Sequence, residues 1–360
     1  MTLNHYLSPM TKRAPTPHIS KKKIMYRVSP ELHSYLRTYD RERPLPVQYA
    51  DLKRFENSMV VYDKHGKDTL WVSAIYSQSE TAELHQGLKE IYSILKTGGD
   101  KSVHKHLHIE RVDFCTFGNS NPFRVKIVNN YNDVYDYFYI KQADASRVYG
   151  LELEHILCPS RINYFVDTHT LIEEHIAGIP GDVFITNYLS NPEFNQKRIA
   201  KEFVKFNERC FVRLLGDMRS YNYVFDITPD FEEVQFRIRA IDFDQQSYEG
   251  RKNLYLPQFF KENKELVGLV KKHINDEVIK QYQSEERTLI SQRISASRAQ
   301  LQSLLTAMEH DTIAPADKVS QLCSELSKHY KVDFRECRSM GDILRASLNI
   351  MIGKSAEKLK

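Results

Sequence analysis

The sequence predicts an α+β protein in which a small antiparallel β portion precedes a larger helical portion. Three runs of strand-forming residues, 109–117, 123–128 and 134–141, are separated by turn-forming residues, which indicates an antiparallel meander. Apolar residues at helical spacing dominate 256–352, where we expect extra C-terminal helices. A chain of 360 residues is long enough for one two-lobed domain or for two to three smaller domains.

Composition restricts the class of protein. With 41% hydrophobic and 27% charged residues, the chain has the composition of a soluble globular protein. The formal net charge of +4 gives no reason to expect a nucleic-acid partner, and no apolar run is long enough to cross a bilayer. The N-terminal residues lack the apolar centre of a signal peptide. The five cysteines are scattered without a Cys-x-x-Cys pair, so we expect no disulfide framework, no structural zinc site and a cytoplasmic location.

Before the meander, the sequence predicts a β-hairpin followed by a helix. Strand-rich runs at 59–62 and 69–76 flank a loop that contains Gly66, which is typical of a hairpin. Apolar residues then recur at helical spacing over 81–96, and Gly98 is placed to end that helix. Residues 1–50 are poorly patterned, and we leave them as a separate N-terminal segment.

The rest of the chain is expected to alternate helices with a few strands. We expect helices at 144–157, 197–215, 256–283, 285–309, 315–330 and 340–352. We expect strands at 162–166 and 170–176, and a hairpin that turns at Thr228-Pro229-Asp230. These elements divide the chain into an N-terminal lobe over 51–176, which holds the antiparallel sheet, and a helical C-terminal lobe over 177–360.

One stretch carries an arrangement of residues that suits phosphoryl transfer. Asp217 is followed five positions later by Asn222, and the second strand of the hairpin ends in Asp242-Phe243-Asp244. Phosphoryl transfer needs a carboxylate that orients the incoming hydroxyl, and oxygen ligands from Asn and Asp that hold magnesium against the phosphates. Asp217, Asn222 and Asp242 supply these groups in that order. The alternative is that these acidic residues are solvated turn residues at the two ends of a hairpin.

Lys141 closes the third strand of the meander, after a run of aromatic residues. Such a lysine can keep its stem against apolar surface and direct its ammonium group at an anionic phosphate. In the helix that follows, Glu152 lies within an apolar stripe with Val148 and Ile156, and a carboxylate in that position requires a cationic partner. Glu154 is the other candidate for that role, and the alternative for both is an exposed helix surface.

On these residues the sequence resembles the protein-kinase-like superfamily. In that family Asp-x-x-x-x-Asn forms the catalytic loop and Asp-Phe-Gly forms the metal-binding turn, which correspond here to Asp217, Asn222 and Asp242. The pair Gly216-Asp217 is most similar to the aminoglycoside phosphotransferases and other small-molecule kinases, in which His-Gly-Asp is usual. The resemblance covers about 109–250. It implies a bilobal kinase-like fold and a dependence on ATP and Mg²⁺.

The resemblance also implies roles for individual residues. Asp217 is the catalytic base, and Arg219 stabilises charge near the transferred phosphate. Lys141 holds the nucleotide phosphates and pairs with Glu152 or Glu154, while the turn at Gly118 covers the phosphates. The backbone of Glu174 and Ile176 binds the adenine edge, and the metal ligands are Asn222, Asp242 and Asp244.

The sequence departs from the family pattern at two places. Leu215 stands where the family has histidine, and the turn before the second meander strand holds a single glycine, Gly118. A nucleotide-binding pseudokinase without turnover is therefore a second hypothesis, and a structural interaction protein that uses its helical tail is a third. The acceptor is expected to be a hydroxyl group, on a small molecule rather than on a protein.

Overall fold

A computed structural model describes residues 23–63, 66–117, 120–230, 234–352 and 359. The chain divides into two compact units. The described residues of the first, called here the sheet unit, fall within 23–144 and 162–175. Those of the second, called here the helical unit, fall within 145–161 and from 176 onward.

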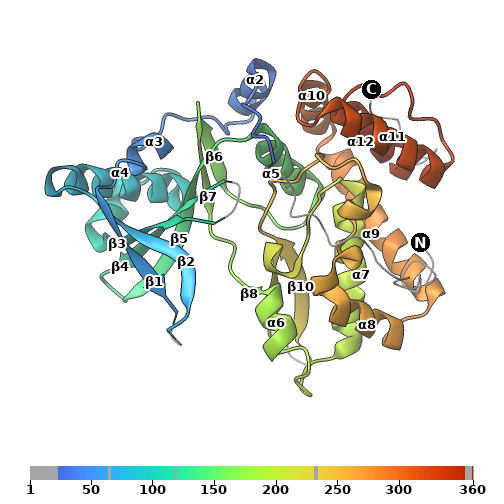
Figure 1. Ribbon diagram of the computed structural model, residues 1–360, viewed down its shortest axis with the longest axis horizontal. Coiled ribbons are helices and arrows are strands. Elements are labelled where there is room, and N and C mark those ends of the chain that lie inside the picture. Colours follow the sequence, from blue (N-terminus) through green and yellow to red (C-terminus); the bar gives the residue numbers. More distant parts are fainter. Residues whose placement is uncertain (1–22, 64–65, 118–119, 231–233, 353–358, 360) are drawn as a thin grey trace. The chain divides into compact units, whose positions relative to one another are not determined.

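The sheet unit is built on a seven-stranded sheet with the order β1-β2-β3-β4-β5-β7-β6, in which every neighbouring pair is antiparallel (Figure 1). Its strands are β1 (Asn57–Tyr62), β2 (Asp68–Ile75), β3 (Leu107–Cys115), β4 (Phe123–Asn129), β5 (Val134–Gln142), β6 (Tyr164–Asp167) and β7 (Thr170–Glu174). Its helices are α2 (Pro30–Thr38), α3 (Tyr49–Leu52), α4 (Gln78–Thr97) and the 3₁₀ turn η1 (Lys101–His106). The predicted hairpin and meander are thereby confirmed.

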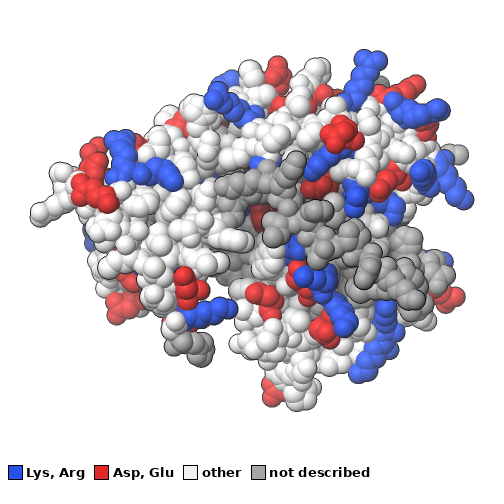
Figure 2. All heavy atoms as spheres, in the orientation of Figure 1, with Lys and Arg blue, Asp and Glu red and all other residues white. Residues whose placement is uncertain are grey.

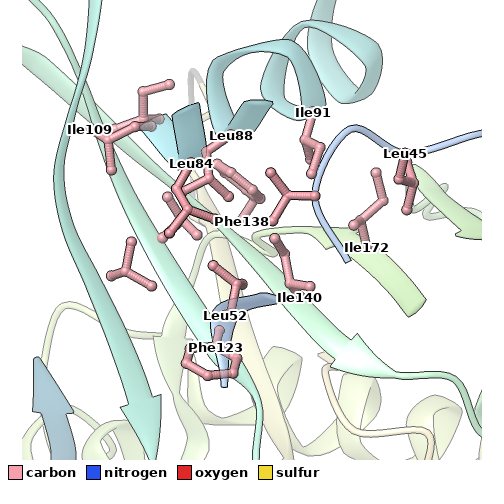
Figure 3. Close-up of a cluster of buried hydrophobic side chains, with 14 of the residues drawn as sticks. Leu45, Leu52, Leu84, Leu88, Ile91, Ile109, Phe123, Phe138, Ile140 and Ile172 are labelled. Atoms are coloured by element: carbon pink, nitrogen blue, oxygen red, sulfur yellow. The ribbon is translucent and has the colours of Figure 1, made fainter. Parts of the chain in front are cut away.

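Helix α4 supplies one side of the core of the sheet unit. Ser77 caps its first turn, and Gly98 ends it in the left-handed region with φ of 64°. The apolar stripe that predicted the helix is buried against strand residues such as Ile109 and Phe138 (Figure 3). Because successive residues of a strand face opposite sides, β4 buries Phe123, Val125 and Ile127 on the same side.

The helical unit combines helices with a small antiparallel sheet of order β10-β9-β8. The strands are β8 (Ile179–Pro180), β9 (Tyr223–Thr228) and β10 (Gln235–Ala240). The helices are α5 (Ala145–Leu157), α6 (Gly181–Asn187), α7 (Gln196–Val212), α8 (Lys264–His273), α9 (Asp276–Ala296), α10 (Arg298–Glu309), α11 (Ala316–Tyr330) and α12 (Met340–Ile352). Four 3₁₀ turns complete it: η2 (Ser220–Asn222), η3 (Lys252–Tyr255), η4 (Pro257–Phe259) and η5 (Lys261–Asn263).

Helix α7 organises the helical unit because it packs against α8, α9 and β10. One of its apolar stripes, formed by Ile199, Phe203, Phe206 and Cys210, is buried. Helix α7 ends at Val212, and the chain then enters the loop that carries Asp217. An antiparallel sheet unit and a larger helical unit with additional C-terminal helices confirm the predicted α+β fold class.

Two expectations about individual elements were wrong, and one helix lies where no element was expected. The poorly patterned segment 1–50 contains α2, whose start is marked by the cap Ser29 and by Pro30 at the first helical position. The helix expected at 256–283 is broken because Asn275 caps α9 through a hydrogen bond from the Val278 N–H. Helix α9 then continues through the expected break to Ala296, with Ile279, Ile290 and Ile294 buried.

The assignment of α5 also differs from the expected lobes. The sequence grouped 144–157 with the sheet, whereas 145–161 belongs to the helical unit. Within the described residues, no helix is long and apolar enough to cross a membrane. On the face drawn in Figure 2, lysine and arginine side chains are interspersed with aspartate and glutamate side chains.

Candidate active site

The loop after α7 has an unusual backbone conformation. Leu214 and Asp217 have positive φ angles of 55° and 56°. Aspartate tolerates this left-handed region better than most residues, because its short polar side chain can bond locally. The Asp217 N–H donates to the Leu254 carbonyl at 3.1 Å, which fixes the loop from outside.

This loop is paired with the turn that follows Asp242-Phe243-Asp244. The Gly216 N–H donates to the Gln245 carbonyl at 3.2 Å, and Leu215 forms an antiparallel bridge with Gln246. The Gln246 side chain is fully buried and donates to the carbonyls of Arg213 and Leu214. The structure therefore brings the two predicted motifs together within the helical unit, although they are separated by about one hairpin in sequence.

Asp217 lies in an environment that favours its protonated form. Burial is the largest cause and raises the pKa of Asp217 to about 6, and the negative charges of Asp242 and Glu249 also raise it. Arg219 acts in the opposite direction, since its Nε donates to Asp217 Oδ1 at 2.8 Å. A carboxylate with a pKa near 6 is ionised at neutral pH and is more basic than an ordinary aspartate, as a general base should be.

Arg219 links Asp217 to a second acidic residue. Its Nη1 donates to Glu262 Oε1 at 2.9 Å, while its Nε binds Asp217, so the guanidinium joins two carboxylates. The guanidinium carbon also lies 5.2 Å from the centre of the Phe260 ring. The sequence pointed to Arg219 but gave no sign of Glu262, which comes from a distant 3₁₀ turn.

Asn222 closes the loop and lies beside the segment that leads into the Asp242–Asp244 turn. Its Nδ2 donates to the Asp217 carbonyl at 2.8 Å, and its backbone carbonyl accepts from the Ile241 N–H at 3.0 Å. The residue is 8% exposed. Because the amide nitrogen is turned toward Asp217, the amide oxygen is the atom that remains as a possible cation ligand.

Asp242 and Asp244 both bind Arg147, a residue of α5 that sequence analysis did not select. Arg147 Nη1 lies 2.9 Å from Asp242 Oδ1 and 2.7 Å from Asp244 Oδ1. The Arg147 side chain is 2% exposed, whereas that of Asp242 is 36% exposed. The carboxylates proposed as metal ligands therefore already have a cationic partner.

The two glutamates predicted to pair with Lys141 have other partners on the helical unit. Glu154 forms a buried ion pair with Arg213 at the end of α7. Glu152 Oε2 accepts from Gln300 Nε2 at 3.2 Å. A pair between Lys141 and either glutamate would join the two units, and it stays a prediction.

In the sheet unit, Lys141 pairs with Glu173 on the neighbouring strand β7. The Lys141 Nζ lies 2.9 Å from Glu173 Oε2, and both side chains are less than 10% exposed. Sequence analysis named the next residue, Glu174, and missed Glu173, although antiparallel pairing of β5 and β7 would have placed both beside the lysine strand. Glu173 holds the ammonium group as the predicted helix glutamate was expected to.

The remaining nucleotide-binding predictions concern the backbone of Glu174 and Ile176, expected at the adenine edge, and the turn at Gly118, expected over the phosphates. The Glu174 N–H donates to the Asn163 carbonyl at 3.0 Å. A backbone donor to adenine would therefore have to come from Ile176, which is 9% exposed. Gly118 lies outside the described residues. No group of three or more His, Cys, Asp or Glu side chains suited to a metal occurs in the described part of the chain.

Gly181 at the start of α6 lets that helix approach the segment that follows the Asp217 loop. A Cβ at Gly181 would lie 2.3 Å from the Tyr223 ring and 2.4 Å from the backbone oxygen of Ser220. We therefore expect Gly181→Ala to lower the free energy of unfolding by about 1–3 kcal/mol, because the backbone of η2 must move. Urea unfolding monitored by circular dichroism measures this change.

Gly268 in α8 is the matched control for that substitution. A Cβ there meets nothing within 4 Å, and the residue lies inside a regular helix. Gly268→Ala should raise the free energy of unfolding by about 0.5–1 kcal/mol, since alanine favours the helix over glycine. Equal effects of the two substitutions would show that the close contact at Gly181 is not important for stability.

Comparisons with known proteins give a distant structural similarity. No family model matches the chain, and no curated protein does. Among solved structures, the chain is similar to the autoinhibited serine kinase domain of the giant muscle protein titin, with a TM-score of 0.27 and 14% identity over 69% of this chain and 94% of that one. A second match is titin kinase with its flanking domains, with a TM-score of 0.27 and 13% identity over 69% of this chain and 55% of that one.

The order of helices and strands along the chain indicates the fold class of this protein. An antiparallel sheet unit is followed by a helical unit in which a long helix, a loop with Asp217, a hairpin and an acidic turn succeed one another. This order is consistent with a bilobal kinase-like fold.

Proposed function

We propose that the protein is a phosphotransferase that moves the γ-phosphate of ATP to a hydroxyl acceptor in a Mg²⁺-dependent reaction. The observation that carries the proposal is the cluster in the helical unit: Asp217, with a pKa near 6, lies on the loop that pairs with the Asp242–Asp244 turn. The Gly216-Asp217 pair favours a small-molecule acceptor over a protein, as in the aminoglycoside phosphotransferases.

In this proposal the chain's own groups bind, orient and accept a proton. Asp217 Oδ2 accepts the proton of the acceptor hydroxyl, because Oδ1 is already held by Arg219. Arg219 keeps the carboxylate in one orientation and adds a fixed positive charge beside the reacting groups. Asn222 fixes the backbone carbonyl of Asp217 and with it the left-handed conformation of the loop.

The oxygen donors of the loop fit a hard cation. The amide oxygen of Asn222 and the partly exposed carboxylate of Asp242 are the ligand types that Mg²⁺ prefers, and Asp244 adds a third. Mg²⁺ supplies charge neutralisation at the phosphate oxygens when it is bound. The nucleotide itself would be held by the Lys141 ammonium, oriented by Glu173, and by the backbone of Glu174 and Ile176.

A second function is favoured by one specific observation. Arg147 neutralises the carboxylates of Asp242 and Asp244, and Arg219 bridges Asp217 to Glu262, so each acidic group of the site already has a cation. A nucleotide-binding pseudokinase, which regulates a partner without turnover, could use such a site. A phosphotransferase consumes ATP and a pseudokinase does not, so a measurement of ATP consumption distinguishes the two functions.

Nucleotide binding separates both functions from a purely structural role. ATP with Mg²⁺ should raise the melting temperature of the wild type, since a ligand that binds only the folded state stabilises it by about 2.7 kcal/mol at 100 times its Kd. Lys141→Met should lose most of that shift, because methionine keeps the apolar stem but not the charge. Lys271→Met, at an exposed position of α8, is the control and should keep it. No shift in the wild type would contradict nucleotide binding.

A further inference from the structure

Arg147 forms an ion pair with each of the two acidic residues of the turn, Asp242 and Asp244. It lies in the first turn of α5, and one nitrogen, Nη1, contacts both Asp242 Oδ1 and Asp244 Oδ1 at 2.9 and 2.7 Å. The other terminal nitrogen, Nη2, lies 3.4 Å from the Ile241 carbonyl. The guanidinium therefore contacts three acceptors of one turn, as a bound cation would.

The turn itself is arranged around this contact. Asp242 Oδ1 also accepts from the Asp244 N–H at 3.0 Å, which folds the two acidic residues onto the same side. The Arg147 guanidinium carbon lies 6.0 Å from the centre of the Phe243 ring, between the two aspartates in sequence. Because Arg147 is almost completely buried, its charge is screened very little by solvent.

Helix α5 cannot move away from the turn without losing several interactions. Gly150, one turn after Arg147, lies so close that a Cβ would be 2.9 Å from the Cβ of Phe243 and 3.1 Å from that of Gln246. The Tyr149 hydroxyl donates to Asp311 Oδ2 at 3.1 Å, and Glu154 pairs with Arg213. The position of the guanidinium is therefore set by the packing of the whole helix.

The shared guanidinium determines how this site interacts with a divalent ion. Two carboxylates that already contact one guanidinium offer a cation less negative charge than the same two carboxylates without it. A divalent ion at the same oxygens must either share them with Arg147 or displace a buried guanidinium, and displacement would remove both of these carboxylate contacts from a buried charge. Either route lowers the affinity of the turn for the ion.

We propose that Arg147 is a built-in counter-cation that prevents Asp242 and Asp244 from binding a divalent ion on their own. On the proposed phosphotransferase function, this makes magnesium binding dependent on the nucleotide, whose phosphates supply the missing negative charge. Arg147 is thus a positioning residue that regulates the metal site, and the site stays without metal until substrate arrives.

The test uses the protein without nucleotide, so its outcome does not depend on whether ATP is turned over. Addition of about 10 mM MgCl₂ should change the melting temperature of the wild type by less than about 1 °C. Arg147→Gln should melt at a lower temperature than the wild type without magnesium, and magnesium should raise its melting temperature by about 4 °C or more. Adding Asp242→Asn to Arg147→Gln should abolish the gain. Arg345→Gln, which removes another arginine–carboxylate pair at Glu309, is the control and should not respond to magnesium.

A second measurement covers the case in which Arg147→Gln does not fold. Binding of Mn²⁺ to the wild type is followed by electron paramagnetic resonance, first alone and then with a non-hydrolysable ATP analogue. We expect at least about tenfold tighter Mn²⁺ binding with the analogue, a coupling of about 1.4 kcal/mol or more. The proposal would be overturned if the wild type bound Mn²⁺ tightly without the analogue. It would also be overturned if a folded Arg147→Gln showed no change in melting temperature with magnesium. Loss of analogue binding altogether would instead refute the proposed function.

Discussion

Asp217→Asn should reduce the rate of ATP consumption by about 10²-fold or more. The amide cannot accept the proton of the acceptor hydroxyl, and this is the step in which the carboxylate is proposed to act. The substitution is mild for the fold, because asparagine tolerates the φ of 56° at this position at least as well as aspartate does. Initial rates with wild-type and variant protein at equal concentrations measure the effect.

Two controls make that result specific to catalysis. The melting temperature shift produced by ATP with Mg²⁺ should persist in Asp217→Asn, since the proposed nucleotide contacts come from other residues. Asp226→Asn, on strand β9 of the same hairpin, should keep the wild-type rate. If Asp217→Asn consumed ATP as fast as the wild type, Asp217 would not be the base.

Arg213→Met should lower the free energy of unfolding by about 3–5 kcal/mol. Arg213 and Glu154 form an ion pair whose side chains are 2% and 5% exposed, so removing the arginine leaves a buried carboxylate without its cation. This pair ties α5 to the end of α7, next to the loop that carries Asp217. Urea unfolding of the wild type and variant gives the difference.

A double substitution separates the charge effect from the loss of packing. Arg213→Met combined with Glu154→Gln should be more stable than Arg213→Met alone, because no charge is then left unpaired. Effects of the two single substitutions that simply add in the double variant would mean that the residues do not interact.

The fold could be predicted largely from local patterns. The strand-forming run of β4 and the helical spacing of apolar residues in α4 and α7 reflect the burial of these elements, and the structure confirms them. Helix α2 was missed because it is short and offers few periods, although Ser29 and Pro30 are typical of a helix start. The break before α9 was missed because the capping residue Asn275 lies within a run that reads as continuous helix.

The sequence could predict only those residues of the candidate site that belong to short motifs. Asp217, Asn222 and Asp242 belong to motifs with fixed spacing, and the structure brings their loop and turn together. Arg147 and Glu262 reach the site from distant segments, and nothing in their local sequence distinguishes them from surface charges. Glu173 was recognisable only once the pairing of β5 with β7 was known.

The pH dependence of ATP consumption tests the central claim most directly. Burial raises the pKa of Asp217 to about 6, so the base is protonated below that pH and ionised above it. The rate of the wild type should therefore increase with pH through about 6 and level off near neutral pH, while Asp217→Asn stays slow at every pH. A wild type that consumes no ATP near neutral pH, or a rate with no dependence on pH around 6, would contradict the account.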